Sequence, residues 1–415
     1  MYHTIVIGGG PSGLMAAISA SESKKKVLLI DKKDQLGRKL QISGGGRCNV
    51  TNNVTHEELI KNLPGNGKFL YSAFQTFDNY AIIEYFEHLG VALKEEDHGR
   101  MFPVSNNAKD VVNALKQQLI NNNVDVKTTT KVESLIIEDN IIKGVMLSDN
   151  IPVYSDNIII ATGGKSVPHT GSTGDGYVFA EQAGHTITDL FPTEVPITSN
   201  ETFIKSKILQ GLSLQNISLS VLRKNGKPRI THQMDMLFTH FGISGPAALR
   251  CSQFIYHEQR SQKKEDIQMM IDVFPDMTSG QLTQHIEKMI NDNKDKSVKN
   301  SLRGLVQERY LHFLLDRAEI NLEDSGHHLK KEKLKIFIDL LKAFTFTVNG
   351  TLSIDKAFVT GGGVSVKEIV PATMQSKMHN NLYFCGEVLD IHGYTGGYNI
   401  TSALVTGYVA GISCR

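Results

Sequence analysis

The chain has 415 residues, 40% hydrophobic and 21% charged, a composition typical of a globular protein with room for two or three domains. Its 44 Lys and Arg balance 43 Asp and Glu, so the formal net charge is +1. This balance provides no field of one sign that attracts nucleic acid or anionic lipid, and we expect neither as a partner.

The cysteines predict a reducing compartment. Cys48, Cys251, Cys385 and Cys414 lie far apart and form no CxxC pair, which argues against a disulfide framework, a zinc knuckle or a local redox disulfide. No apolar run approaches the ~20 residues needed to cross a bilayer. Glycines also interrupt the first strand before it could serve as a signal peptide. We therefore expect a soluble cytoplasmic protein, and the sequence is silent on its oligomeric state.

The first predicted elements, over residues 4–31, are a strand, a glycine turn, a helix and a second strand that ends in an acid. In the GxGxxG turn, Gly8 permits a tight bend, Gly10 lets the backbone approach a pyrophosphate, and Gly13 lets helix and strand pack closely. The helix N-terminus favours the phosphates, and Asp31 can accept the hydroxyls of an adenosine ribose. NAD and FAD remain open at this point. The unit offers a nucleotide Gly8, Gly10, Pro11, Ser12, Gly13, Asp31 and Lys32.

The segment "GRKLQISGGGRCNVTNN", residues 37–53, follows six residues after that acid. It is too glycine-rich and too polar for a core element, so we expect it to run along an extended dinucleotide toward its far end. A mobile surface loop is the alternative. The residues predicted to contact the cofactor here are Arg38, Lys39, Ser43, Gly45, Arg47, Cys48 and Asn49.

Helices and strands follow in a recognisable order. Helical patterns cover residues 67–90 and 107–123, and a strand meander begins at Val124. The meander ends in "NIIIATGG", whose small residues Ala161, Thr162 and Gly163 suit the close approach of a nucleotide, although a plain turn is the alternative.

The pattern changes twice more. Short alternating stretches after Pro192 predict an inserted β-domain, and amphipathic helices follow from about Thr278 to Leu341. The apolar strand pattern returns at Ala357 and ends in a strand, a glycine-rich crossing and a last helix.

Two features of this last part favour FAD over NAD. Gly386 and Glu387 end a strand, and a carboxylate there can accept hydrogen bonds from a ribitol chain, which FAD has and NAD lacks; a helix cap is the alternative. The last helix follows Gly397 and Asn399 in "GYTGGYN". Its positive end would stabilise the negative charge of a reduced flavin by ~0.3 to 1 kcal/mol, and by up to ~2 where partly buried.

Motifs along nearly the whole chain closely resemble a bacterial aminoacetone oxidase-like or NAD(P)/FAD-dependent oxidoreductase family, which includes a flavoprotein of the bile-acid-inducible pathway. They are "GRKLQISGGGRCNVTN", "GRMFP", "GSTGDGY", "LFTHFGISGPAAL", "TGGGV" and "CGEVLDIHGYTGGYNI". The resemblance implies an α/β fold: a discontinuous, glutathione-reductase-like FAD-binding domain with an inserted β-barrel and a small helical domain. With the pattern changes, the expected ranges are 1–190 and 357–415 for the FAD-binding domain, 191–277 and 343–356 for the barrel, and 278–342 for the helices.

The resemblance also implies roles for single residues. It assigns Asp31 to the adenosine ribose, the Val132 backbone to adenine, and Glu387 to the ribitol. It places Thr162 and Gly163 beside the nucleotide. At the pyrimidine edge of the flavin it places Asn399 and Ile400.

Several absences bear on the mechanism. Cys48 has no CxxxxC partner, so a thiol relay is not expected, and no second GxGxxG precedes a helix, so no nicotinamide domain is predicted. NAD(P)H could then act only as a transient electron donor that reaches the flavin through the substrate cleft. No HExxH or clustered acids indicate a metal. His392 and Tyr394 are candidate pocket residues, with bracing of the glycine turn as the alternative.

We therefore expect an FAD-dependent oxidoreductase that transfers hydride between a small organic substrate and flavin N5. An oxidase of a small amine, such as an aminoketone, using dioxygen is the preferred form. One alternative is an NAD(P)H-dependent reductase of a carbon–carbon double bond in an enone or steroid-like substrate. Another is a flavin-carrying binding or RNA-associated protein, whose RNA version the neutral charge disfavours. The sequence assigns no catalytic side chain.

Overall fold

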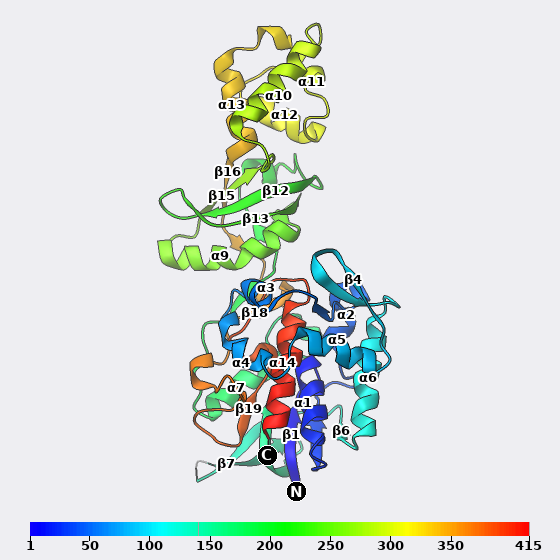
Figure 1. The fold of residues 1–415 in the computed structure, drawn as a ribbon. Coiled ribbons are helices and arrows are strands. Elements are labelled where there is room, and N and C mark those ends of the chain that lie inside the picture. Colours follow the sequence, from blue (N-terminus) through cyan, green and yellow to red (C-terminus); the bar gives the residue numbers. More distant parts are fainter. Residues whose placement is uncertain (140, 415) are drawn as a thin grey trace. The chain divides into compact units, whose positions relative to one another are not determined.

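The computed structural model describes residues 1–139 and 141–414. The chain forms two compact units. Their residues can be followed in Figure 1 by the colours, which run along the sequence. The discontinuous unit comprises Met1–Pro192 and Ile354–Arg415, and the inserted unit comprises Thr193–Ser353. In the part of the chain that the structure describes, no helix is both long and apolar enough to cross a membrane.

The discontinuous unit is built on a mixed seven-stranded sheet. Its centre is parallel and largely apolar, as in the all-apolar β2, because both faces of a parallel sheet are covered. One long strand, β9 (Pro152–Ile160), belongs to both parts: it pairs with the antiparallel meander near Tyr154 and with the parallel strands from Ser155 onward. The order is β6 (Asp125–Lys127), β2 (Val27–Ile30), β1 (Tyr2–Ile7), β9, β8 (Ile141–Leu147) and β7 (Val132–Glu138), with β19 (Leu382–Phe384) parallel to β9.

Two helices from opposite ends of the chain pack together on this sheet: α1 (Pro11–Ser21) and α14 (Tyr398–Ser413), blue and red in Figure 1. A Cβ at Gly407 would overlap the Ser12 carbonyl oxygen, and one at Gly411 would overlap Ser19 Oγ, so both glycines allow close contact. Ser19 Oγ also donates to the Tyr408 carbonyl at 3.0 Å.

The direction of these contacts sets the position of the two helix N-termini. The first turn of α1 meets the middle of α14, and later residues of α1 meet later residues of α14, so the helices run the same way. Nine residues separate the start of α14 from Gly407. At ~1.5 Å per residue, α14 begins about 13 Å beyond the start of α1. Two positive helix ends are thus offset along one direction, which suits an extended ligand.

Shorter elements complete this unit. A three-stranded antiparallel sheet has the order β3 (Thr51–Asn52), β5 (Arg100–Pro103), β4 (Leu93–Glu96), and β10 (Phe191–Thr193) pairs with β18 (Val359–Gly361). The remaining α-helices are α2 (Arg38–Ile42), α3 (His56–Lys61), α4 (Tyr71–Phe74), α5 (Asn79–His88), α6 (Ala108–Asn121) and α7 (Asp175–Gln182). Side chains at Thr55, Asp78 and Asn107 cap α3, α5 and α6, as Thr, Asp and Asn commonly do.

The inserted unit is a seven-stranded sheet with helices. Its strand order is β16 (Phe344–Val348), β15 (Ile267–Asp272), β12 (Ser213–Leu222), β13 (Pro228–Phe238), β14 (Gly242–Ser244), β11 (Ile197–Thr198) and β17 (Gly350–Thr351). Its helices are α8 (Thr202–Lys205), α9 (Pro246–Gln262), α10 (Ser279–Asp292), α11 (Val298–Ser301), α12 (Glu308–Arg317) and α13 (Lys331–Ala343).

Strands and helices of the inserted unit share one apolar core. The rings of Phe238 on β13 and Tyr310 on α12 lie 6.0 Å apart, and Phe203 on α8 lies 5.3 Å from Phe313 on α12. The expected helical range 278–342 therefore packs on the same core as the strands. The strand order runs as a path from β16 to β17, and closure into a barrel remains a prediction.

Candidate functional site

The glycine turn after β1 has the geometry that the sequence predicts for a phosphate-binding turn. Gly8 has φ +105°, and a Cβ there would lie 2.5 Å from the Ala161 carbonyl oxygen; a Cβ at Gly13 would overlap the Gly8 carbonyl. Gly10 differs, because a Cβ there would meet no atom within 4 Å. Gly10 is the N-cap of α1, Pro11 follows it, and no side chain caps the helix. Open space thus faces an uncapped helix N-terminus, which favours an anion.

Asp31 is held at the end of β2. Its two carboxylate oxygens accept hydrogen bonds from the amides of Gly9 at 2.6 Å and Lys33 at 2.7 Å. An ionised carboxylate has about four acceptor sites, so two remain for the hydroxyls of a ribose. The Thr130 amide donates to the Asp31 carbonyl at 3.0 Å. The segment that leads to buried Val132 therefore lies beside Asp31.

The four basic residues predicted to contact the cofactor are each held by a carboxylate. Lys32 pairs with Asp175 at 2.5 Å and also donates to Thr173, and Arg38 pairs with Asp34 at 2.8 Å. Arg47 forms two hydrogen bonds to Glu96, at 3.1 and 2.6 Å, and its guanidinium lies 4.0 Å from the centre of the Phe102 ring. Lys39, the fourth, is described below. Phosphate contacts from these side chains remain predictions.

The glycine-rich segment is ordered around a buried thiol. Gly44, Gly45 and Gly46 all have positive φ, and Cys48 is buried with φ 60°. Ser43 Oγ donates to the Leu40 carbonyl at 2.7 Å. Burial raises the pKa of Cys48 to about 12, against the opposing effect of its hydrogen bond to Ser43. The thiol is therefore protonated at neutral pH. All four cysteines are free thiols.

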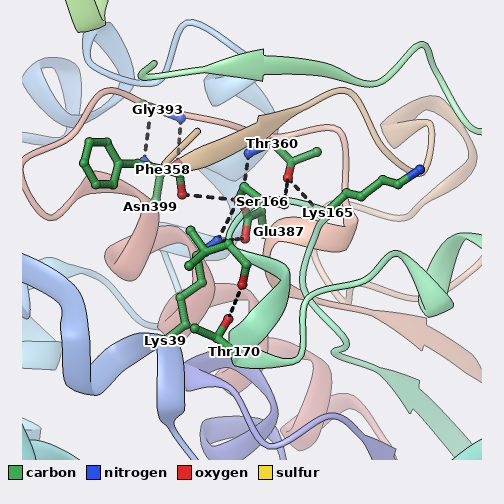
Figure 2. Close-up of polar contacts among 10 residues, drawn as sticks. Lys39, Lys165, Ser166, Thr170, Phe358, Thr360, Glu387, Gly393 and Asn399 are labelled. Carbon is green, nitrogen blue, oxygen red and sulfur yellow. Dashed lines mark hydrogen bonds and ion pairs between the residues drawn. The ribbon is translucent and has the colours of Figure 1, made fainter. Parts of the chain in front are cut away.

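Lys39 and Glu387 form the centre of a polar network that Figure 2 shows. Lys39 Nζ lies 2.8 Å from Glu387 Oε2 and 2.8 Å from Ser166 Oγ. Glu387 Oε1 accepts from Ser166 Oγ at 3.1 Å and from the Thr360 amide at 2.8 Å. Thr360 Oγ1 in turn accepts from the amides of Lys165 and Ser166, at 2.8 and 3.0 Å. The network ties α2, the segment after β9, β18 and the segment after β19 together.

Glu387 was expected to accept hydrogen bonds from ribitol, and it retains capacity for this role. Oε1 has two donors, but Oε2 has one within this network. Burial raises the pKa of Glu387, but the Lys39 charge, followed by hydrogen bonds from Lys39, Thr360 and Ser166, outweighs burial and holds the pKa below its ordinary value. The carboxylate is therefore ionised and remains an acceptor at neutral pH. Ser166 and Thr360 were not singled out from the sequence as site residues, although Thr360 begins the quoted motif "TGGGV".

This lowered pKa predicts a pH dependence of stability. A carboxylate whose pKa is lower in the folded state stabilises the fold above its unfolded pKa, about 4.3, and loses that contribution as the pH falls through the folded pKa. The difference in unfolding free energy between wild type and Glu387→Gln should therefore shrink below about pH 4.3. Urea unfolding of both apoproteins, followed by circular dichroism across this range, measures it. A constant difference would contradict an ion pair of this kind.

Two buried asparagines lie against the start of α14. The side-chain oxygens of Asn52 and Asn49 would be 2.7 and 2.9 Å from a Cβ at Gly397, the N-cap of the helix. The nitrogen and oxygen atoms of both side-chain amides have no hydrogen-bond partner among residues 1–139 and 141–414. A buried amide without a hydrogen-bond partner destabilises the folded state by about 1–3 kcal/mol. We therefore infer that these two side chains bind a ligand.

Other parts of the proposed cofactor site also have buried polar groups that lack a partner among the described residues. They are Thr162 Oγ1, directly after β9, and the Tyr177 hydroxyl on α7. Together with the open side of Gly10 and the uncapped N-termini of α1 and α14, these groups fit FAD, a ligand with a pyrophosphate, a polyol and a polar flavin edge.

Asn399 and the candidate pocket residues brace the turn before α14. The Asn399 side chain accepts from the Gly393 amide at 2.8 Å and donates to the Gly393 carbonyl at 2.8 Å, so an approach to flavin would use its backbone or that of Ile400. His392 exchanges backbone hydrogen bonds with Gly65, at 3.0 and 3.1 Å. The Tyr394 amide donates to the Asn62 carbonyl at 3.0 Å. Both side chains are buried, and a substrate-pocket role for them remains a prediction.

The asparagine pair makes a prediction in which apoprotein stability and cofactor affinity respond differently. Asn52→Leu replaces an unpartnered amide by an apolar group of similar size, so the apoprotein should be as stable as wild type or more stable. FAD affinity, measured by titration of the apoprotein, should fall about tenfold to a hundredfold, since a buried hydrogen bond is lost.

Asn53→Leu is the matched control, because this exposed neighbour donates to Glu95 at 2.7 Å. It should change FAD affinity little. Equal FAD affinities of the two variants would contradict the role of Asn52.

Comparison with known proteins identifies the family. Residues 2–413 match the family described as "HI0933-like protein Rossmann domain". The chain belongs to this family. It is an α/β protein with a Rossmann-like FAD-binding domain, and it is an FAD-dependent oxidoreductase.

Three characterised relatives of this HI0933-like protein are similar over nearly their whole length. The ribosomal RNA dihydrouridine synthase of Haemophilus influenzae is 31% identical, over 99% of this chain and 98% of the relative. The Escherichia coli enzyme of the same name is 30% identical, over 96% and 94%. The 3-dehydro-bile acid delta(4,6)-reductase of Clostridium scindens is 29% identical, over 98% and 97%.

Proposed function

We propose that this HI0933-like protein reduces a carbon–carbon double bond conjugated to a carbonyl, and that its substrate is uridine in ribosomal RNA. The observation that carries the proposal is the end-to-end similarity to ribosomal RNA dihydrouridine synthases from two organisms. Dihydrouridine is uridine with the C5–C6 double bond saturated, and that bond is conjugated to the C4 carbonyl.

The bile-acid relative supports the same bond class. A delta(4,6)-reductase acting on a 3-dehydro bile acid saturates double bonds conjugated to the 3-ketone. Ribosomal RNA and bile acids share little except this activated double bond. Reduction therefore takes precedence over the amine oxidation expected from the sequence, for which these relatives offer no support.

The side chains of the site position the cofactor. The amides at the start of α1 bind the pyrophosphate, Asp31 binds the ribose, Glu387 binds a ribitol hydroxyl, and Asn49 and Asn52 bind the polar flavin edge. Bound FAD supplies the hydride at its N5 atom. Cys48 is buried and protonated at neutral pH, so it takes no part as a thiolate.

The redox balance requires a reductant, and we propose NAD(P)H. One NAD(P)H and one proton add two hydrogens across one double bond and leave NAD(P)⁺. Because the sequence predicts no nicotinamide domain, we propose that the reductant would reach the flavin by the substrate's route and leave before the substrate binds. This predicts ping-pong kinetics. The proposed ribosomal RNA substrate also supports the cytoplasmic location expected from the sequence, which we keep as part of the proposal.

The test uses the purified holoprotein and ribosomal RNA isolated from cells that lack it. After anaerobic incubation with NADH or NADPH, the RNA is digested to nucleosides and analysed by mass spectrometry. A uridine heavier by two hydrogens, formed only with reductant, is the expected result.

Parallel incubations test the other substrates. A 3-dehydro-4,6-diene bile acid replaces RNA in one, and an aminoketone with air replaces RNA and reductant in the other. Turnover of the bile acid alone would transfer the proposal to steroid-like enones. Hydrogen peroxide from the aminoketone alone would overturn reduction in favour of the oxidase.

A further inference from the structure

The near-zero net charge conceals an uneven distribution between the two units. Residues 193–353 contain 22 Lys and Arg against 18 Asp and Glu, whereas residues 1–192 and 354–415 contain 22 against 25. The inserted unit is therefore basic and the discontinuous unit acidic. The net charge of the whole chain, on which the expectation of no nucleic-acid partner rested, therefore describes neither unit.

The excess of the inserted unit comes from one surface, which we call the basic hollow. It combines the turn between β12 and β13 with the end of α9 and the segment that follows it. Residues 222–229 and 258–266 have seven basic residues and three acidic ones, and this difference equals the excess of the whole unit. The basic residues, all exposed, are Arg223, Lys224, Lys227, Arg229, Arg260, Lys263 and Lys264.

The surface is hollowed between these segments. An open cavity of about 670 Å³ has walls from the β12–β13 turn, the end of α9, β15 and β16. Basic side chains and neutral polar side chains line it together, with two carboxylates. The lining residues are Leu222, Arg223, Lys224, Gln262, Lys264, Glu265, Asp266, Gln268 and Thr347.

Hydrogen bonds fix the walls of the hollow. Gln262 Nε2 donates to the Leu222 carbonyl at 3.3 Å and to Glu258 Oε2 at 2.9 Å, which joins the end of α9 to β12. Gln259 Nε2 donates to the Glu265 carbonyl at 2.6 Å and to the Asn349 carbonyl at 3.3 Å. The cations thus lie on backbone segments that these hydrogen bonds already hold in place, which reduces the entropy lost when a ligand binds.

The three cations that line the cavity are available to a ligand. Among the described residues, Arg223, Lys224 and Lys264 have no carboxylate within ion-pair distance; Arg229 lies 3.8 Å from Glu258. Exposed, unpaired cations need little desolvation to bind a phosphate, and they release its counterions. Glu265 and Asp266 limit the anionic charge that the hollow accepts.

We propose that the basic hollow binds the sugar–phosphate backbone of the RNA that carries the uridine to be reduced. This proposal rests on the proposed function, because it deepens the choice of ribosomal RNA as substrate. The cations contact phosphates, and the amides of Gln262 and Gln268 can bond to 2′-hydroxyls or base edges. A bile acid has one carboxylate and no chain of phosphates, so it could not occupy several of these cations at once.

The test compares wild type with two charge-matched variants of the full holoprotein. The hollow variant carries Arg223→Gln, Lys224→Gln and Lys264→Gln. The control carries Lys288→Gln, Lys331→Gln and Lys335→Gln, exposed positions on α10 and α13; Figure 1 shows α13 at the far end of the inserted unit from α9. Anisotropy of a fluorescein-labelled RNA stem–loop with uridines in its loop reports affinity at several KCl concentrations, and nucleoside mass spectrometry reports dihydrouridine.

The hollow variant should bind this RNA about tenfold to a hundredfold more weakly at about 0.1 M KCl, and its slope of log K against log[KCl] should fall by about 2. The control should match wild type, and Glu265→Gln with Asp266→Asn should tighten binding. Equal RNA affinity of the hollow and control variants, with dihydrouridine still formed, would overturn RNA binding by the hollow. The proposed function would then still hold. Weakened binding by the hollow variant alone, with no dihydrouridine from any form, would support the surface and remove the function. A wild type that does not bind the stem–loop would overturn the hollow as an RNA site.

Discussion

Gly10→Asp is expected to give a folded protein without flavin. Gly10 has φ −75°, and a Cβ at this position would have no atom within 4 Å, so aspartate fits the apoprotein. As the N-cap of α1, aspartate can accept a hydrogen bond from the first turn, which keeps apoprotein stability equal or raises it. The same carboxylate faces the pyrophosphate site. Two like charges about 4 Å apart repel by about 4 kcal/mol at an effective dielectric constant of ~20, which weakens FAD binding on the order of a thousandfold.

Gly10→Asn is the matched control, because asparagine has the same shape and the same capping ability without the charge. FAD titrations of both apoproteins, with thermal unfolding as the check on folding, separate repulsion from steric exclusion. We expect Gly10→Asn to bind FAD clearly better than Gly10→Asp. Normal flavin binding by Gly10→Asp would show that the pyrophosphate does not lie at the start of α1.

Lys39→Met is the second large expected effect. It keeps the apolar stem of the side chain but removes the cation 2.8 Å from Glu387. The side chains of Lys39 and Glu387 are 27% and 18% exposed, so the usual cost of breaking a buried pair, about 3–5 kcal/mol, falls to about 2 kcal/mol of unfolding free energy. The pKa of Glu387 should rise in the variant. Its deficit in stability relative to wild type should therefore shrink from about pH 7 to about pH 4, as the carboxyl becomes protonated.

A double-mutant cycle with Glu387→Gln checks this expectation by urea unfolding of the apoproteins. Lys39→Met with Glu387→Gln should be more stable than Lys39→Met alone, because no unpaired carboxylate is left. If the two changes add without interaction, the network of Figure 2 does not depend on this ion pair.

Local patterns were sufficient to predict the geometry of the glycine turn, while its role in binding FAD stays a prediction. The roles of Gly8, Gly10 and Gly13 follow from their spacing between an apolar strand and a helix, and the structure gives each the expected surroundings. Asp31, which directly follows β2, was likewise predicted from its place after an apolar strand. Here each conformational requirement falls on residues that are neighbours in the sequence, so the sequence contains the information.

Pairings over long sequence distances could not be predicted. Lys39 and Glu387 are 348 residues apart, and only the packing of the two chain ends brings them together. The same holds for Ser166, which both of them contact. Arg47 was predicted to contact the cofactor by its charge, but Glu96 lies 49 residues later and receives two hydrogen bonds from it. Charge identifies a residue that needs a partner without identifying the partner.

Asn52 shows a different limit. The sequence singled out Asn49 as a hydrogen-bonding residue of the glycine-rich segment but omitted Asn52 three positions later. Only burial without a partner, beside Gly397 from the other end of the chain, distinguishes it from an ordinary strand residue. Net charge has a similar limit, since it averages an acidic unit with a basic one.

The central claim is that segments from both ends of the chain bind one FAD molecule. Its most direct test is to titrate the wild-type apoprotein, Gly10→Asp near one end of the chain and Glu387→Gln near the other with FAD in the same experiment, with visible absorbance as the readout. One FAD per chain of 45.9 kDa, with weakened uptake by both variants, is the predicted result. Wild-type apoprotein that is colourless once excess unbound FAD has been removed, or loss of affinity at one end of the chain alone, would contradict it.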